Sequence, residues 1–184
     1  MSKKSVADAL RSLRQIPHKQ REVLDNSKGI IKIAKKHLHL GAFLYLARNV
    51  NYPVALEGAL KLKEVSCIPA EGYAAGEMKH GPIALIDEYR AVVCIANKSS
   101  VYDKMISNIQ EILARRGKII IMATSGDTRM RGYTKEVVFI PAIEEVFSPL
   151  LTVVPLQIFA YYTAKLKGYN VDMPRNLAKS VTVE

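Results

Sequence analysis

The sequence contains few cysteines and no long apolar run. Cys67 and Cys94 lie in apolar neighbourhoods without the spacing of a metal site, so we expect two reduced core residues, with a disulfide as the alternative. No uninterrupted apolar run approaches the ~20 residues that a membrane-spanning helix needs, and the N-terminus lacks the apolar segment of a signal peptide. The sequence therefore predicts a cytoplasmic protein that does not enter a membrane, and we expect neither a metal nor a cofactor.

Acidic side chains are scarce near the N-terminus. Residues 1–40 hold ten basic and three acidic side chains, which is +7 of the chain's net charge of +10. Such a segment can bind nucleic acid, but it has no aromatic side chains for stacking on bases and no zinc-finger spacing. We therefore expect a solvated helical segment without a nucleic-acid partner, and a positive field that attracts anionic sugar phosphates.

Helical and buried-strand patterns alternate along the 184 residues, a length that suits one domain. We expect Pro17 to separate the first two helices, and residues 67–88 carry few regular signals. Buried strands that alternate with helices predict a three-layer α/β/α fold of the flavodoxin-like type, with a mostly parallel sheet of about five strands. The predicted helices are 3–14, 18–37, 53–66, 101–116 and 148–167, and the predicted strands are 42–47, 91–96, 118–124 and 136–141.

Ligands of parallel α/β folds gather at the carboxyl ends of the strands, which directs attention to the loops there. In one of these loops, Ser99 and Ser100 lie at the start of a predicted helix, where backbone N–H groups can receive an anion. A stand-alone module that binds a sugar phosphate at this place is therefore one interpretation of the chain. The expected loops are 48–53, 67–82, 97–100 and 124–134.

A charged pattern runs along the predicted helix 53–66. Glu57, Lys61 and Glu64 are spaced i, i+4 and i+7, which places them on one helical face. Two small residues directly after Glu57 allow a neighbouring backbone to approach closely. The pattern fits either an exposed face with an ordinary ion pair or a ligand site on this face.

The segment 69–82 is rich in small residues and is long for a connection without regular structure. His80 is its chemical handle, because an imidazole with an ordinary pKa of about 6.5 moves protons at neutral pH. A histidine that is hydrogen-bonded within its own turn, or is simply exposed, is the alternative. We expect the other three histidines, His18, His37 and His39, to lie on the surface.

The last ten residues combine apolar side chains with one lysine, Lys179. Chain ends are usually polar and frayed, so the apolar composition predicts a tail that docks on the domain. Docking would desolvate the amine of Lys179, which favours its neutral form and makes it a nucleophile toward carbonyls. A solvated lysine on a frayed end is the alternative.

Glu64, His80 and Lys179 together fit the chemistry of an open-chain sugar. A carboxylate can carry a proton between adjacent carbons, and a histidine can move the proton that opens a sugar ring. An amine can form an imine with a ketose and thereby acidify the neighbouring C–H bond. The residues therefore favour aldose–ketose isomerisation.

Three segments of the chain resemble one known family. Leu56–Glu64, Gly72–Pro82 and Asp172–Glu184 are similar, in this order, to the glucosamine-6-phosphate synthase family, the glutamine–fructose-6-phosphate aminotransferases (isomerizing). The resemblance spans essentially the whole chain and is to the second sugar-isomerase (SIS) half of the isomerase domain. The implied organisation is a single SIS domain over 1–184, with a helical N-terminal segment at 1–40 and an active-site tail at 169–184.

The resemblance also implies roles for Glu64, His80 and Lys179. Glu64 would move the proton between C1 and C2, His80 would assist ring opening in the neighbouring subunit of a homodimer, and Lys179 would form the imine. The substrate would be fructose 6-phosphate and the product glucosamine 6-phosphate. Further residues of the implied site are Glu57, Lys61 and Ala178, the last in a tail that covers the sugar.

Two parts of that family have no counterpart in this sequence. One is the N-terminal glutaminase domain, so glutamine would not supply ammonia here, and the other is the first SIS half. In the family that half brings the Ser/Thr-rich loop that grips the sugar phosphate, whereas the equivalent position here reads Asn97–Ser100. We therefore expect a fragment that is inactive by itself; a stand-alone sugar-phosphate-binding regulatory module is the alternative.

Overall fold

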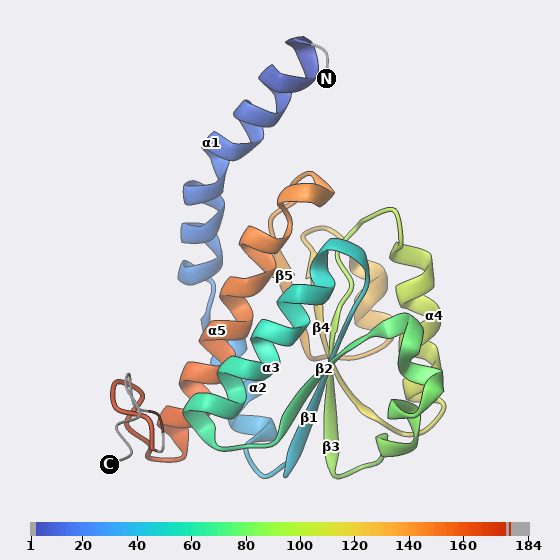
Figure 1. Cartoon of the computed structure of the whole chain (residues 1–184), viewed down its shortest axis with the longest axis vertical. Helices are drawn as coiled ribbons and strands as arrows, with labels where there is room; N and C mark the ends of the chain where they lie inside the picture. Colours follow the sequence, from blue (N-terminus) through green and yellow to red (C-terminus); the bar gives the residue numbers. More distant parts are fainter. Residues whose placement is uncertain (1–2, 176, 178–184) are drawn as a thin grey trace, which may run out of the picture.

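Five parallel strands form the centre of the fold in the order β2-β1-β3-β4-β5 (Figure 1). The computed structural model describes residues 3–175 and 177. The strand order reverses between β1 and β3, which is the switch point of a flavodoxin-like sheet and confirms the predicted fold class. The strands are β1 Ala42–Ala47, β2 Ala70–Ala74, β3 Arg90–Ile95, β4 Lys118–Thr124 and β5 Val137–Ile140.

Helices cover both faces of this sheet (Figure 1). On one face α5 contacts α1, α2 and α3, and on the other face α4 packs together with the 3₁₀ turn η2. The helices are α1 Lys3–Asp25, α2 Lys28–His37, α3 Tyr52–Ser66, α4 Tyr102–Leu113 and α5 Pro149–Leu166. The 3₁₀ turns are η1 Asn49–Asn51, η2 Ala75–His80, η3 Pro82–Leu85, η4 Thr128–Gly132 and η5 Glu145–Phe147.

Successive side chains of a strand point to opposite faces, so each central strand contributes to two cores. In β1, Phe43, Tyr45 and Ala47 pack with α3 and α5, whereas Leu44 and Leu46 pack with α4 and η2. All five are buried. Burial on both faces explains why the central strands are continuous apolar runs, which made them visible in the sequence.

The segment 145–166 is long and apolar enough to cross a membrane, judged by length and composition alone. In the fold they include α5, which contacts three other helices. Its side chains Leu151, Leu156 and Phe159 are buried in the cores. The central place of α5 in the helical layer accounts for its apolar composition.

The first helix does not break at Pro17, and the prediction of two helices separated there is wrong. α1 continues through the proline to Asp25, and the turn before α2 falls after that residue. Pro17 removes one backbone donor and is exposed. On either side of it, Ile16 and Val23 are buried against α5, so tertiary packing fixes α1 around the proline.

The segment after α3 contains a strand that the sequence did not reveal. β2 pairs with β1, with Phe43 opposite Ala70 and Ala47 opposite Ala74. β2 is an edge strand and lacks the apolar run of the central strands. Its formation depends on the hydrogen-bonding edge that β1 supplies, which is a tertiary effect without a local signal.

Two surface and core assignments are wrong as well. Cys67 is exposed, because it ends α3 in a left-handed conformation with φ of 55°. Cys94 is buried as expected, and both cysteines are free. His37, expected on the surface, is only 4% exposed, because the last turn of α2 directs it inward.

Burial leaves the imidazole of His37 in an unusual state. Within the described part of the chain, neither of its ring nitrogens has a hydrogen-bond partner. Desolvation lowers the pKa of His37 to about 4, opposed by the nearby carboxylate of Glu136 and assisted by three neighbouring basic groups. Those groups are Lys36, Lys118 and His39. The folded protein therefore keeps this imidazole neutral at neutral pH.

We predict that His37 makes the fold sensitive to acid. Because its pKa is lower in the folded than in the unfolded chain, the unfolded chain binds the extra proton below about pH 6.5. The free energy of unfolding should fall by up to about 1.4 kcal/mol per pH unit from pH 6.5 to about 4 through this group, and no further below. Urea unfolding of the His37→Leu variant should lack this slope, whereas the exposed control His18→Leu should keep it. An unchanged slope in His37→Leu would refute the assignment.

Candidate functional site

The three charged side chains predicted on one face of α3 do lie together. The Nζ atom of Lys61 lies 2.5 Å from Oε2 of Glu64 and 4.0 Å from Oε1 of Glu57. The hydrogen bond from Lys61 to Glu64 is the main cause that raises the pKa of Lys61, so this lysine stays an ammonium ion. We call Glu57, Lys61 and Glu64 the α3 charged face.

Close packing on the opposite side of α3 fixes the direction of this face. A Cβ atom on Gly58 would lie 2.6 Å from Cδ1 of Leu156 and 3.0 Å from the ring of Tyr45. Ala59 and Leu62 are also buried on that side. The small residues therefore let α3 sit directly on β1 and α5, and the charged face points outward.

The end of α3 meets the beginning of the C-terminal tail. A pocket of about 190 Å³ lies between them. Lys179 and Ala178 lie outside the described residues. The pocket is lined by Val65, Cys67, Tyr169, Asn170, Met173 and Arg175, among others.

His80 lies on the other face of the sheet from the α3 charged face. Its neighbour Met78 is buried in the core shared with α4, and Lys79 forms an ion pair of 2.8 Å with Glu111 of α4. The side chain of His80 is 72% exposed and contacts Glu77. Within one chain the structure therefore brings Glu57, Lys61 and Glu64 together but does not bring His80 to them.

The predicted anion position at the start of α4 is filled by a side chain of the protein itself. The backbone N–H of Ser100 donates to Oε2 of Glu145 at 2.7 Å, and its hydroxyl donates to Oε1 at 3.0 Å. Asn49 donates to the same carboxylate at 2.9 Å. The N–H of Ser100 is the main cause that lowers the pKa of Glu145. A ligand bound by Ser99 and Ser100 would have to displace this carboxylate.

A buried polar network below that position was missed by sequence reasoning. Asn51 donates to Asn97 at 3.1 Å and to Ser148 at 2.9 Å, and it accepts a hydrogen bond of 2.7 Å from Thr152. Both asparagines follow strands that flank the switch point. Their positions just past two apolar runs were the available signal. The network joins the loops after β1 and β3 to the start of α5.

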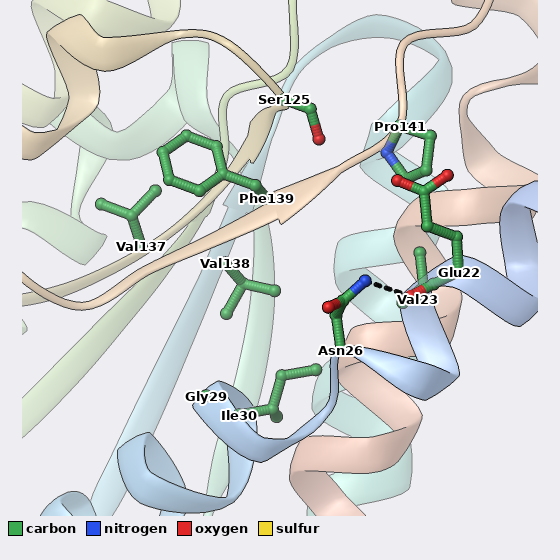
Figure 2. Close-up of a pocket in the computed structure, with 10 residues that line it drawn as sticks. All are labelled: Glu22, Val23, Asn26, Gly29, Ile30, Ser125, Val137, Val138, Phe139 and Pro141. Atoms are coloured by element: carbon green, nitrogen blue, oxygen red, sulfur yellow. Dashed lines mark hydrogen bonds between the residues drawn. The ribbon is translucent and has the colours of Figure 1, made fainter.

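A further pocket, of about 330 Å³, lies beside the edge strand β5 (Figure 2). Figure 2 shows Glu22 and Asn26, from the junction of α1 and α2, across the pocket from Val138 and Phe139. It holds none of the predicted site residues. Over residues 3–175 and 177, no cluster of three His, Cys, Asp or Glu side chains is arranged to hold a metal ion.

The sheet order and the arrangement of its helices define an α/β domain of the sugar-isomerase type. The chain belongs to the SIS domain family, which matches residues 41–166. Curated relatives named glutamine–fructose-6-phosphate aminotransferase (isomerizing) include those of Aquifex aeolicus, 52% identical over 95% of this chain, and Chlorobaculum tepidum, 50% identical over 100% of it. The chain spans about 30% of the length of both relatives.

Solved structures agree with this assignment. The C-terminal domain of glucosamine-fructose-6-phosphate aminotransferase from Francisella tularensis matches with a TM-score of 0.88 and 34% identity, over 95% of this chain and 49% of that one. The tagatose-6-phosphate ketose/aldose isomerase from Escherichia coli matches with a TM-score of 0.74 and 18% identity, over 86% and 45%. The second likeness shows a shared fold only.

We predict that the side chains of Ser100 and Glu145 are energetically coupled in the folded protein. A double-mutant cycle of Ser100→Ala and Glu145→Ala should give a coupling of about 1 kcal/mol in urea unfolding, because the hydroxyl bond to a carboxylate is partly screened by solvent. The contribution of Glu145 should be present above about pH 4.3 and be lost below it, since its pKa is lowered by folding. The exposed control Glu88→Ala should show no coupling to Ser100→Ala. Strict additivity of the first pair would disprove the contact.

Proposed function

We propose that this chain forms the C-terminal sugar-isomerase part of an enzyme that converts fructose 6-phosphate and glutamine-derived ammonia to glucosamine 6-phosphate. The observation that carries the proposal is the α3 charged face, on a helix whose last turn meets the start of the C-terminal tail. About half of the residues are identical to relatives that bear the name of this enzyme. We propose a cytoplasmic location for the same reason.

The α3 charged face and the tail have complementary chemistry in this proposal. The neutral amine of Lys179 attacks C2 of the open-chain ketose, water leaves, and an imine forms; ammonia then replaces the lysine. Glu64 takes a proton from C1 and returns it to C2, which completes the ketose-to-aldose shift without oxidation or reduction. Lys61 stays protonated, orients the carboxylate of Glu64 and, with Glu57, faces the sugar. Ala178 belongs to the tail that covers it.

His80 requires a second chain to reach the sugar. Because it lies on the opposite face of the sheet from Glu64, we propose a homodimer in which His80 of one chain assists ring opening in the partner's site. Leu56 and Leu60 are exposed apolar side chains on α3, and their burial would favour association.

The phosphate group of the substrate needs a binding site outside this chain. The carboxylate of Glu145 occupies the start of α4 and would repel a phosphate group bound there. This favours a phosphate site on the first SIS half, as in the resembling family, over a stand-alone sugar-phosphate-binding module that uses Ser99 and Ser100. The chain by itself is accordingly expected to be inactive, with the glutaminase domain and first SIS half as its partners.

We predict that Glu64→Gln in the complete enzyme lowers kcat by about 10²- to 10⁴-fold, because the amide cannot accept the C1 proton. The measurement is the rate of glucosamine 6-phosphate formation at saturating fructose 6-phosphate. Glu88→Gln removes an exposed carboxylate outside the α3 charged face and should retain the wild-type rate. A Glu64→Gln enzyme with unchanged kcat would remove Glu64 from the mechanism.

A further inference from the structure

The turn that carries His80 holds a second ionisable side chain in contact with the imidazole. The distance from Nδ1 of His80 to Oε2 of Glu77 is 2.9 Å. Resting on the proposed function, we propose that Glu77 is a positioning residue that holds His80 as the Nδ1–H tautomer and leaves Nε2 free to accept the proton that opens the sugar ring.

The backbone of η2 brings these two side chains together. A 3₁₀ helix has three residues per turn, so the side chains at i and i+3 lie one above the other. Glu77 and His80 have this spacing within η2. Between them Met78 is 1% exposed, and Ala75 at the start of the turn is fully buried. The buried pair fixes the rotation of the turn, which directs Glu77 and His80 to the same outer side.

A chain of polar contacts holds the same turn from the other side. Lys79 is bonded to Glu111 at 2.8 Å, Asn108 donates to Glu111 at 3.2 Å, and Arg48 donates to Asn108 at 3.0 Å. Burial alone would raise the pKa of Glu111, but the hydrogen bonds from Lys79 and Asn108 outweigh it and lower that pKa. The carboxylate of Glu111 therefore stays charged and anchors η2 to α4 and to the loop after β1.

The contact between Glu77 and His80 determines where the ring proton lies. An ionised carboxylate has only acceptor oxygens, so the ring nitrogen that it contacts must carry the proton. Nδ1 then donates to Glu77, and Nε2 of the neutral ring keeps its lone pair. A histidine free in water favours the opposite tautomer, with the proton on Nε2. Glu77 thus turns the outward nitrogen of His80 into a base.

This tautomer sets the order of proton transfers in ring opening. Nε2 first takes the proton of the anomeric hydroxyl, the bond between C2 and the ring oxygen breaks as the C2 carbonyl forms, and the new Nε2–H then gives its proton to the ring oxygen. One proton has moved between two sugar oxygens, and nothing is oxidised or reduced. While the imidazole of His80 carries this extra proton, the carboxylate of Glu77 stabilises its positive charge.

The spectroscopic test reads the tautomer directly. In long-range ¹H–¹⁵N correlation spectra of this chain, the ratio of Nδ1–H to Nε2–H tautomers of His80 should be about two- to fivefold higher than in Glu77→Ala, the range expected for an exposed charged contact. Both side chains are exposed, so the alanine variant should fold normally. The control Glu88→Ala should leave the ratio unchanged. Equal ratios in wild type and Glu77→Ala would overturn the proposal, whatever the enzyme does.

The kinetic test uses the complete enzyme. Glu77→Ala should lower kcat about two- to fivefold, in step with the tautomer ratio, with KM changed less than about twofold, because the substrate still binds but Nε2 starts as a base in fewer molecules. Glu88→Ala should have wild-type kinetics. An unchanged kcat in Glu77→Ala would overturn the proposal if His80→Ala is impaired. If His80→Ala is also unimpaired while the tautomer ratio responds to Glu77, the role of His80 in the proposed function is what fails.

Discussion

The close contact of α3 with β1 and α5 is the constraint on which the candidate site depends. Gly58 leaves no room for a side chain between α3 and the buried Tyr45 and Leu156. A larger residue there would push α3 away from the sheet or rotate it about its axis, and the α3 charged face would turn with it. The contact also places the last turn of α3 at the start of the C-terminal tail. Core packing thus determines which charged groups meet.

The sheet divides the proposed chemistry into two parts. The α3 charged face and the start of the tail lie on the side of α5, and the turn with Glu77 and His80 lies on the side of α4. A parallel sheet buried on both faces separates these groups within one chain. Assembly with a second chain is the simplest way to unite them, and the phosphate grip would come from the other SIS half. In the proposed function, the fold supplies acid–base groups whose use depends on neighbouring chains.

The central parts of the fold could be predicted from the sequence, whereas the parts that depend on contacts between distant residues could not. Buried apolar runs predicted the strands at 42–47 and 118–124 with the bounds that are observed, and residue spacing predicted the α3 charged face. β2 was missed because its partner strand supplies the reason for it to form. The break predicted at Pro17 was wrong because packing of α1 on α5 overrides the local preference of proline to end a helix. The bond between Ser100 and Glu145 joins residues 45 positions apart, and no local pattern encodes it.

Trapping the imine tests most directly whether the tail and the α3 charged face form one site. The complete enzyme is incubated with fructose 6-phosphate and borohydride, and the modified lysine is identified by peptide mass spectrometry. The account predicts a reduced adduct on Lys179 and none on Lys61, because Glu64 raises the pKa of Lys61 and keeps it protonated. An adduct on Lys61, or full turnover without any adduct on Lys179, would contradict it.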